Sequence, residues 1–397
     1  MSGVLPVASE KDKRIVVFTC EPTSGAARYV KEWGLSLASA GATVTLICPS
    51  NFDFRDELSS RGLAIVASSE RQCFAAGRME RVARNLGQLW RNAGILLRTV
   101  RRGDVVHFQF TQRLIGITFF VLSYLRRCRI VLTAHDPRPH KWLLPEIFRR
   151  VEWRLTQWSY SLSDRIIVHN EAGRQVLITD FRQPTDKLVV IPHGPFKVEN
   201  YAATPGPRED KLRVLLFGSI RENKGVYQAI EAVQLVNAGG DTRVLLTIAG
   251  EVFNAGEASY WQKCRGLIAR DPEGITVIDR YVRDDEIGTL FGCNDVLLLP
   301  YNSYTSESGV AALALANRKA IIAARTGGLT ALLDRGGCGI PIGECTPAGI
   351  GEAICKAIDA GPEALDVMGR AGAAMLEAER SWHTIARKTL QVYAGIA

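Results

Sequence analysis

The sequence lacks the short motifs that identify several large enzyme classes. Its nine cysteines form no C-x-x-C pair, its six histidines show no H-E-x-x-H spacing, and no G-x-x-x-x-G-K-[ST] phosphate loop occurs. The first apolar segment is followed by CEPTSGA instead of G-x-G-x-x-G. These absences weigh against a zinc enzyme, a P-loop enzyme and a dinucleotide-binding dehydrogenase. We expect no bound metal, and the scattered cysteines predict reduced, mostly buried thiols.

Long apolar segments are also missing. The apolar run 114–125 has twelve residues between arginines, which is too short to cross about 30 Å of hydrocarbon. It therefore predicts a core or interfacial helix. The first fourteen residues are polar and charged, with no apolar segment ahead of a small-residue cleavage site. We accordingly expect no secretory signal and a cytoplasmic protein.

Positive charge is concentrated in one part of the chain. The net charge is +8, but residues 71–160 contain 17 Lys and Arg against 5 Asp and Glu, a local net charge of +12. Seven arginines of this stretch alternate with apolar residues: Arg78, Arg81, Arg84, Arg91, Arg98, Arg101 and Arg102. The pattern predicts a basic amphipathic helix or helix pair, either lying on an anionic membrane surface or forming an ordinary solvated face. No nucleic-acid-binding motif accompanies the charge, so we expect no nucleic acid partner.

The length of 397 residues and the hydrophobic content of 47% favour two domains. Runs typical of buried strands alternate with helical segments, first at 14–20, 42–48, 104–108, 130–134, 165–169 and 188–191. A second series follows at 213–217, 244–249, 275–278, 295–299 and 320–323, with 339–342 as a candidate sixth. The proline-containing stretch 192–207 between them is predicted to be a linker. The pattern predicts an α/β protein with two Rossmann-like, doubly wound domains facing a cleft.

One loop of the second series carries the chemistry of phosphate binding. The run LLFGSIRENKG at 215–225 ends an apolar strand at Gly218 and then offers two cations, Arg221 and Lys224, beside a helix start. A glycine lets the backbone approach a ligand, an arginine grips two phosphate oxygens, and a lysine near a helix N-terminus adds a point charge. The loop therefore predicts a diphosphate site, and a plain solvated loop is the alternative.

Segments along almost the whole chain resemble glycosyltransferase family 4, a large retaining group with the two-Rossmann GT-B fold. In the first half these are PTSGAARYV at 22–30, VVHFQ at 105–109, VLTAHD at 131–136 and VIPHG at 190–194. In the second half they are 217–225, IAGE at 248–251, YVRDDEI at 281–287, 295–301, the glycine pair 327–328 and the tail 381–393. The resemblance implies an acceptor-binding domain 1–194, a nucleotide-sugar-binding domain 195–381 and a helix 382–397 that crosses back to the first domain.

The resemblance implies that Arg221 and Lys224 bind the diphosphate of a nucleotide sugar and assist catalysis, next to Gly218. The helix amides at Ser308, Gly309 and Val310 would face a phosphate or sugar. The loop at Tyr281 and Val282 would hold the nucleobase, partly by backbone contacts, although Tyr281 could also simply pack at the surface.

One residue departs from the family pattern. Family members carry two glutamates eight positions apart, and here Glu307 is followed at that distance by Leu315. The resemblance gives Glu307 a catalytic contact with the donor sugar, while the ribose contact is in doubt. An acid favoured by a helix N-terminus is the alternative for Glu307.

In the first domain, His135 ends an apolar strand and is predicted to contact the donor sugar or the reacting face. A structural histidine is the alternative. The small residues Ser24 and Gly25 are expected near the donor. His107, Gln109 and Asp136 are weaker candidates for acceptor binding, and Asp136 could also cap its loop.

We therefore expect a hexosyltransferase-type enzyme that moves a sugar from a nucleoside diphosphate sugar to a hydroxyl, with retention and without cofactor or metal. The resemblance and the basic stretch 71–160 favour a lipid-linked or polysaccharide acceptor in cell-surface or exopolysaccharide biosynthesis, at the inner face of the membrane. A sugar-nucleotide epimerase or hydrolase of the same fold is one alternative. A non-catalytic nucleotide-sugar-binding subunit, suggested by Leu315, is the other.

Overall fold

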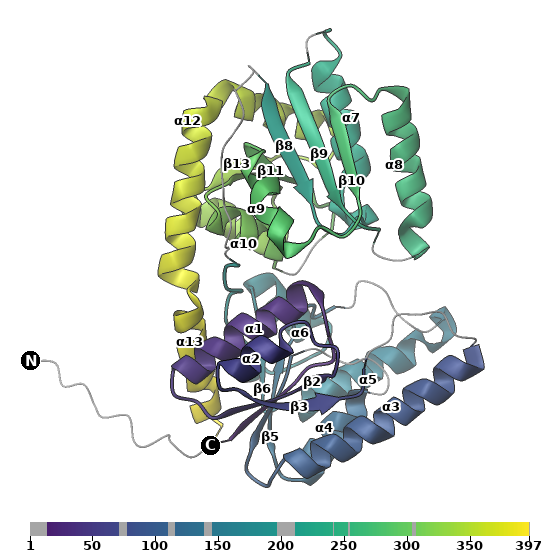
Figure 1. The fold of residues 1–397 in the computed structure, drawn as a ribbon, viewed down its shortest axis with the longest axis vertical. Helices are drawn as coiled ribbons and strands as arrows, with labels where there is room; N and C mark the ends of the chain where they lie inside the picture. Colours follow the sequence, from purple (N-terminus) through teal and green to yellow (C-terminus); the bar gives the residue numbers. More distant parts are fainter. Residues whose placement is uncertain are drawn as a thin grey trace, which may run out of the picture. The chain divides into compact units, whose positions relative to one another are not determined.

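The computed structural model describes residues 14–70, 78–109, 116–138, 145–196, 211–240, 242–252, 255–303 and 307–396. The chain forms two compact units (Figure 1). The first unit comprises Met1–Pro192 together with Trp382–Ala397, and the second comprises His193–Ser381. Most of the predicted linker, from residue 197 onward, lies outside the described residues.

The first unit is built on a parallel sheet whose described strands run in the order β3-β2-β1-β4-β5-β6-β7. Their bounds are Ile15–Phe18 (β1), Val44–Pro49 (β2), Ala64–Ser68 (β3), Val105–Phe108 (β4), Arg129–Thr133 (β5), Arg165–Val168 (β6) and Leu188–Val190 (β7). Six strands agree with the predictions within two residues at each end. The strand β3 was not predicted. It lies at the edge of the sheet, and all its side chains except Ser68 are exposed or half-buried, so its sequence does not resemble a strand covered on both faces.

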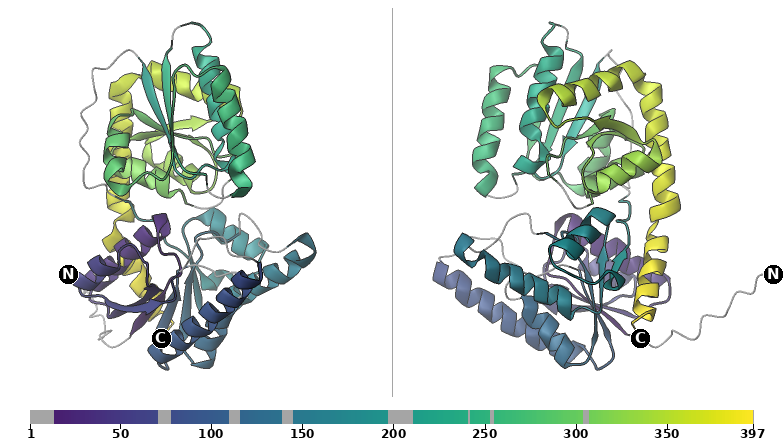
Figure 2. Two further views of the ribbon diagram at one scale, coloured as in Figure 1. Left: turned by 45° about the vertical axis from the view of Figure 1, so that its right-hand side comes forward. Right: turned by 180° about the vertical axis from the view of Figure 1, so that it is seen from behind.

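Helices cover both faces of this sheet (Figures 1 and 2). They are α1 (Ser24–Ser39), α2 (Arg55–Ser60), α3 (Arg78–Thr99), α4 (Ile117–Leu125), α5 (Arg149–Leu162), α6 (Glu171–Thr179) and α13 (Trp382–Ala394). Strand residues such as Val16, Phe18 and Val106 form one core with side chains of α3 to α6. The alternate residue His107 points to the other face and meets α13, because successive strand side chains point to opposite faces.

The helix α13 is an integral part of the first unit. It packs against α1, where the indole nitrogen of Trp33 donates to Thr389 Oγ1 at 3.4 Å. Its buried residues Ile385, Thr389 and Val392 recur at helical spacing, which is typical of a helix with one face in a core. The helix α13 therefore covers part of the first sheet together with α1.

The predicted apolar helix at 114–125 corresponds to α4, which begins at Ile117 after the N-cap Gly116, the first described residue of this stretch. Phe119 and Phe120 are buried in the first core, whereas Tyr124 and Leu125 are exposed. It is thus a core helix with an exposed apolar edge. None of the helices in the described ranges combines the length and the hydropathy needed to span a bilayer.

The second unit contains a parallel sheet of described strands in the order β10-β9-β8-β11-β12-β13. The strands are β8 (Leu212–Phe217), β9 (Val244–Gly250), β10 (Ile275–Asp279), β11 (Val296–Leu299), β12 (Ala320–Ala324) and β13 (Gly339–Ile342), each within one residue of its prediction. The helices are α7 (Val226–Asn237), α8 (Ala258–Arg270), α9 (Asp284–Gly292), α10 (Gly309–Ala316), α11 (Gly328–Gly336) and α12 (Pro347–Arg380), and a 3-10 turn at Glu222–Lys224 precedes α7.

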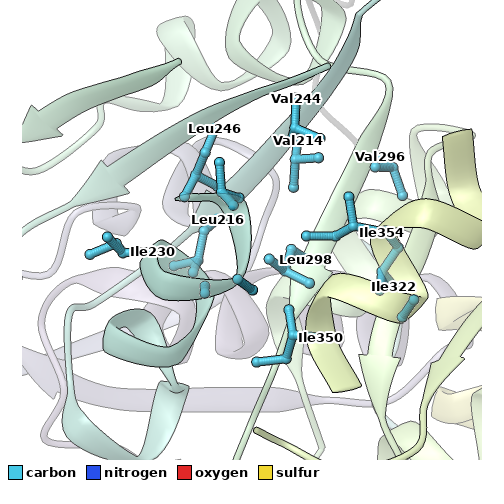
Figure 3. Packing of buried hydrophobic residues seen from close by; sticks show 14 of the residues in the cluster. Val214, Leu216, Ile230, Val244, Leu246, Val296, Leu298, Ile322, Ile350 and Ile354 are labelled. Atoms are coloured by element: carbon cyan, nitrogen blue, oxygen red, sulfur yellow. The ribbon is translucent and has the colours of Figure 1, made fainter. Parts of the chain in front are cut away.

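The core of the second unit fills one face of its sheet (Figure 3). Val214, Leu216, Leu246 and Leu298 alternate along their strands and are at most 5% exposed. Side chains from α7, α8 and α12 pack onto them, among them Ile354. Most strands of this sheet are thus buried, as the second series of runs predicted, whereas the side chains of the edge strand β10 are exposed or half-buried.

Both sheets have a point at which the strand order reverses. In the first unit it lies between β1 and β4, and in the second unit it lies between β8 and β11. At such a point the two neighbouring strands send their connections in opposite directions, which opens a crevice at their carboxyl ends where ligands bind. The loops that follow β8 and β11 are therefore the first place to look for a site in the second unit.

Candidate active site

The loops that follow β8 and β11 lie against each other. Gly225 has a φ of 68°, and a Cβ atom at this position would stand 2.1 Å from the carbonyl oxygen of Pro300. The backbone N–H of Asn302 donates to the carbonyl of Asn223 at 3.1 Å. Only glycine permits both this φ and this approach without strain. The pair of loops is thus held together by main-chain contacts.

Gly218 brings the end of β8 close to α10. Its φ is 111°, and a Cβ atom there would lie 3.3 Å from Val310 Cγ2. A Cβ atom on Gly250, at the end of β9, would come within 2.1 Å of the Gly218 carbonyl oxygen. The backbones of Gly218 and Gly250 and the Val310 side chain therefore meet at the end of β8, where a side chain on either glycine would block the approach.

The two predicted cations act on one buried aromatic residue. The Lys224 Nζ atom lies over the ring of Tyr301, 3.7 Å from its centroid. Tyr301 is only 3% exposed, and burial raises the pKa of its hydroxyl to about 12, against the opposing effects of Ser308 and the Arg221 charge. Tyr301 is therefore protonated near neutral pH, and it lies within the electrostatic reach of both cations.

The start of α10 meets the same tyrosine. Ser308 is the N-cap of α10, and its hydroxyl accepts from the N–H of Ala311 at 3.2 Å and lies 3.3 Å from the Tyr301 hydroxyl. The first N–H groups of a helix, here including those of Gly309 and Val310, have no acceptor within the helix and favour anions. The structure thus brings the predicted cations and the predicted helix N-terminus to one place.

Glu307, next to this N-cap, points its carboxylate into the protein. The Oε2 atom lies 3.3 Å from Nη1 of Arg380, with side-chain exposures of 4% and 5%. The carboxylate also lies against Gly328 at the N-terminus of α11, where a Cβ atom would stand 2.5 Å from its Cδ. Burial raises the pKa of Glu307, and the Arg380 charge opposes this shift. The predicted contact of Glu307 with a donor sugar stays a prediction, whereas its anchoring of the loop is observed.

Leu315 occupies a core position on α10. It is fully buried, and a Cβ atom on Gly372 of α12 would lie 2.6 Å from its Cδ2. The close packing of the two helices explains why an apolar residue stands here. This position offers no polar group for a ribose.

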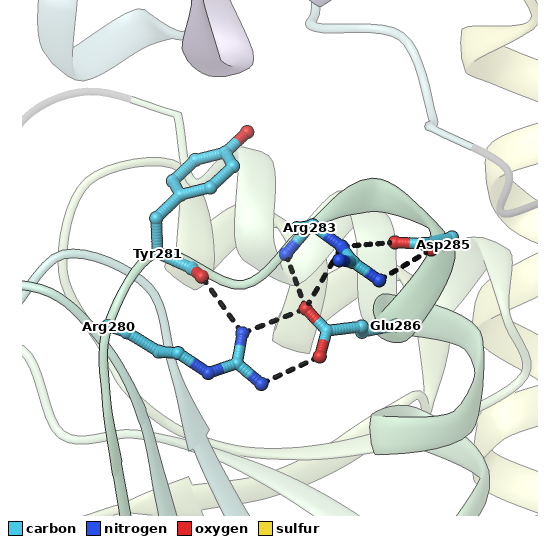
Figure 4. Close-up of polar contacts among 5 residues, drawn as sticks. All are labelled: Arg280, Tyr281, Arg283, Asp285 and Glu286. Atoms are coloured by element: carbon cyan, nitrogen blue, oxygen red, sulfur yellow. Dashed lines mark hydrogen bonds and ion pairs between the residues drawn. The ribbon is translucent and has the colours of Figure 1, made fainter.

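The loop predicted to hold a nucleobase is fixed by charged neighbours (Figure 4). Arg280 donates to the carbonyl of Tyr281 at 3.1 Å and to Glu286 Oε1 at 2.6 Å, and the N–H of Arg283 donates to Glu286 Oε2 at 3.0 Å. These bonds hold the pKa of Glu286 at about 2. The Tyr281 side chain is 51% exposed, whereas Val282 is buried. The loop follows β10, which β9 separates from β8, so it lies apart from the two cations in the sheet order.

In the first unit, His135 is paired with a second histidine. His169 Nδ1 lies 2.9 Å from the carbonyl oxygen of Ile191, which can only accept, so this nitrogen carries the proton in a neutral ring. His169 Nε2 then accepts from His135 Nδ1 at 2.9 Å. His135 is therefore left with its lone pair at Nε2. That atom is covered by protein in this structure, so a sugar hydroxyl could reach it only once this edge of the ring is uncovered.

Two predicted acceptor residues are fully buried. His107 Nδ1 contacts the Tyr393 hydroxyl at 2.5 Å, and its Nε2 contacts Thr133 Oγ1 at 2.8 Å. Burial lowers the pKa of His107 to about 3. This geometry gives His107 a packing role and leaves it no ring nitrogen for an acceptor. Gln109 is also 0% exposed, but its side-chain amide has no hydrogen-bond partner among the described residues, so its predicted role remains a prediction.

The other predicted residues of the first unit lie at the carboxyl edge of its sheet. Ser24 and Gly25 begin α1 after β1, and Gly25 is exposed. Asp136 follows His135 beyond β5 and is half-buried. Ser24, Gly25 and Gln109 thus follow the two strands, β1 and β4, between which the order of this sheet reverses.

The sequence reasoning missed Tyr301, Arg380 and His169. The sequence contains a signal for His169, because both His135 and His169 follow apolar strands directly. The strands β5 and β6 are paired with Thr133 opposite Ile167, so each histidine lies two residues beyond a paired position. No local pattern marks Tyr301 or Arg380, because each acts on a residue brought to it by the fold.

Comparison with known families supports both halves of this description. Residues 23–194 match the family model for Glycosyltransferase Family 4, and residues 211–360 match that for Glycosyl transferases group 1. Glycogen synthase of Mycobacterium tuberculosis (strain H37Rv) is 26% identical over 391 residues, covering 93% of this chain and 90% of that protein.

Solved structures share the fold. Anabaena HepE in complex with UDP-glucose superposes with a TM-score of 0.73 at 15% identity, covering 97% of this chain and all of that one. Sucrose-phosphate synthase of Thermosynechococcus elongatus gives a TM-score of 0.72 at 16% identity, covering 97% and 99%. At these identities the likeness establishes the GT-B architecture alone. The two family matches, one in each unit, show that the chain belongs to the group 1 glycosyltransferases of the GT-B type and is an enzyme of that kind.

Proposed function

We propose that this glycosyltransferase takes its sugar from a nucleoside diphosphate sugar and holds the diphosphate in the second unit. One observation carries the proposal: Lys224, three residues after Arg221 in the same loop, lies over the ring of the buried Tyr301, whose hydroxyl meets the N-cap of α10. Two cations and a helix N-terminus thus gather where ligands bind in such sheets. The UDP-glucose in the structure of Anabaena HepE supports this class of donor.

The chemistry follows from the charge that develops during transfer. As the bond between the anomeric carbon and the diphosphate oxygen breaks, negative charge builds on the leaving group, and fixed cations and amides stabilise it. In our proposal Arg221, Lys224 and the first amides of α10 supply this stabilisation without a metal ion. Transfer proceeds with retention: the acceptor oxygen bonds to the anomeric carbon on the face that the diphosphate leaves, and the acceptor proton passes to a diphosphate oxygen.

The remaining residues take supporting roles in this proposal. The Tyr281 and Val282 loop holds the nucleobase, and Glu307 holds the loop that leads into α10. In the first unit, His135 Nε2 receives a hydrogen bond from a donor-sugar hydroxyl, while Ser24, Gly25, Gln109 and Asp136 form the acceptor side. We propose an acceptor that is a lipid-linked saccharide or a growing polysaccharide, at the cytoplasmic face of the membrane, in cell-surface or exopolysaccharide biosynthesis.

A thermal-shift screen across nucleoside diphosphates and their sugars tests the donor class. A ligand that binds only the folded state stabilises it in proportion to the logarithm of its concentration over Kd. We expect nucleoside diphosphates of one base to raise the Tm and the matching monophosphate to raise it much less, because the monophosphate lacks the second phosphate. A Tm unchanged by every nucleoside diphosphate and sugar nucleotide would contradict the proposal.

Product analysis separates transfer from the two alternatives. Incubation with the stabilising donor and a panel of saccharide acceptors should give a glycosylated product. Release of free sugar or of an epimer without an acceptor would favour an epimerase or hydrolase. Donor binding without turnover would favour a non-catalytic subunit.

A membrane role rests on the exposed face of α3, α4 and α5, which lie together on one side of the first sheet (Figure 2). Nine large apolar side chains are exposed here among those that the structure describes, counting those of the 3-10 turn Glu146–Phe148: Leu86, Trp90, Val121, Tyr124, Leu125, Ile147, Phe148, Val151 and Trp158. Nine described arginines are exposed on the same elements or just after them: Arg91, Arg98, Arg101, Arg102, Arg126, Arg127, Arg149, Arg150 and Arg154. Tryptophan among cations is typical of a surface that rests in the headgroup region of an anionic membrane.

Vesicle flotation tests this basic apolar face. We expect the protein to float with vesicles containing anionic phosphatidylglycerol, to bind neutral phosphatidylcholine weakly, and to dissociate as salt is raised. Replacing both Trp90 and Trp158 by Ser should weaken binding about tenfold or more, since each buries apolar surface in the interface. The control is Leu235→Ser, an equally exposed apolar residue on α7 of the second unit. Equal, negligible binding to both lipids would exclude the membrane role.

A further inference from the structure

We propose that Tyr301 is the positioning residue of the diphosphate site, which fixes Lys224 with its ring and the N-terminus of α10 with its hydroxyl. This inference rests on the proposed function and adds to it the residue that makes the site rigid before a ligand arrives. Tyr301 ends the segment 295–301 that resembles glycosyltransferase family 4 and lies within the second family match, but no role is predicted for it from the sequence.

The ring of Tyr301 holds the lysine. The Lys224 ammonium lies 3.7 Å from the ring centroid, a separation at which a cation is attracted to the negative face of an aromatic ring. Lysine otherwise samples many rotamers and loses that freedom on binding. A lysine already held over a ring loses less of this freedom when its ammonium binds phosphate oxygens.

The hydroxyl of Tyr301 holds the helix. It lies 3.3 Å from Ser308 Oγ, and Ser308 Oγ already accepts from the Ala311 N–H at 3.2 Å. Burial keeps the phenol protonated by raising its pKa to about 12, so it can donate to the second lone pair of the serine. The N-cap of α10 is therefore oriented by a neutral donor that stays the same over the physiological pH range.

The surrounding backbone gives Tyr301 little freedom to move. It is 3% exposed, its neighbour Pro300 is in contact with Gly225, and Asn302 is bonded to Asn223. The Cys345 thiol lies 3.5 Å from the Tyr301 carbonyl oxygen. One aromatic side chain thus couples the loop after β8 to the loop after β11, and both phosphate-binding elements take their positions from it.

The test distinguishes the role of the Tyr301 ring from the role of its hydroxyl. Tyr301→Phe keeps the ring and removes the hydroxyl that holds the N-cap of α10, so its affinity for pyrophosphate should fall about 3- to 10-fold, and Ser308→Ala should show a similar fall. Unchanged affinity in both variants would overturn the role of the hydroxyl. In the Tyr301→Phe background, phenylalanine carrying one, two or three ring fluorines weakens the negative face with little change in volume. We expect pyrophosphate affinity, measured by calorimetry, to fall stepwise over this series, by about tenfold in total.

The decisive comparison repeats the fluorine series with Lys224→Met. There the affinity should be low and independent of fluorination, because the ring acts through the lysine. A purely structural role of Tyr301 would give the same trend with and without Lys224, and that outcome would overturn the inference. Melting temperatures of all variants show whether each is folded.

Two further results separate this inference from the proposed function. If the native protein binds neither pyrophosphate nor any nucleoside diphosphate, the proposed function fails. If it binds them and Lys224→Met abolishes binding while fluorination has no effect, the function stands and the role of Tyr301 is wrong. The contact can also be seen without ligand: the Lys224 side-chain protons should show an upfield ring-current shift in NMR spectra that disappears in Tyr301→Leu.

Discussion

Replacing Lys224 by alanine is expected to weaken the binding of nucleoside diphosphates about 10- to 150-fold, equivalent to about 1.5–3 kcal/mol, the usual contribution of a hydrogen bond to a charged group. The ammonium lies at the reversal point of the second sheet, over Tyr301 and three residues from Arg221. Calorimetric titration gives the Kd directly. The corresponding Arg221→Ala variant should lose at least as much binding affinity for nucleoside diphosphates, because a guanidinium can form two parallel hydrogen bonds to phosphate oxygens.

The matched control for Lys224 is Lys356→Ala. Lys356 lies on α12 of the same unit, is 59% exposed and pairs only across one helical turn with Glu352 in the contacts described. Its removal changes the net charge by the same amount and should leave the Kd unchanged within about twofold, since exposed pairs contribute little. Raising the ionic strength should reduce the difference in Kd between the native protein and Lys224→Ala, because salt screens the charge of the lysine. Equal affinities in all three proteins would mean that the diphosphate lies elsewhere.

Replacing Arg380 by leucine is expected to destabilise the second unit by about 3–5 kcal/mol, because it leaves the Glu307 carboxylate buried without its cation. Both side chains are at most 5% exposed and their charged atoms are 3.3 Å apart. For a unit of this size the loss corresponds to a fall in Tm of roughly 6–20 °C. Differential scanning calorimetry of the native protein and the variant measures it.

A second ion pair, which joins Arg335 of α11 to Glu379 of α12, gives the control. Arg335 and Glu379 are also 3.3 Å apart, but they are 63% and 47% exposed, so Arg335→Leu should cost less than about 1 kcal/mol. The double variant with Arg380→Leu and Glu307→Gln should be about 1–3 kcal/mol more stable than Arg380→Leu alone, because no buried charge remains. If Arg380→Leu and Arg335→Leu lowered the Tm equally, burial of the pair would have no energetic consequence.

Sequence pattern was sufficient for most strands because their side chains are buried on both faces. The edge strand β10 was also predicted, from its apolar residues Ile275, Val277 and Ile278, although its side chains are exposed or half-buried. The run at 213–217 and the strand Leu212–Phe217 differ by one residue, since a parallel strand between helices must be apolar throughout. The exception, β3, is an edge strand with exposed side chains. For β3 the pattern of apolar residues carries little information, because its side chains are not covered by the core.

The cations of the candidate site could also be predicted from sequence. Gly218, Arg221 and Lys224 lie within one strand-loop-helix segment, so their proximity is a matter of local geometry. His107 shows the opposite case. It lies within β4, whereas His135 follows β5, and its ring turns to the face covered by α13, where Tyr393 and Thr133 contact both ring nitrogens. Which helix covers a given face of a strand can therefore depend on a segment almost three hundred residues away in the sequence.

The order of apolar runs, prolines and glycines alone determined that this chain forms two parallel-sheet units and places a glycine and two basic residues after the first strand of the second. These features follow from propensity and periodicity within short segments. Only the tertiary structure decided that Tyr301 lies under Lys224, that His169 sets the proton of His135, and that Glu307 turns to Arg380. Each of these contacts joins residues from separate elements, and the packing of whole helices and strands fixes such contacts, which no local sequence pattern encodes.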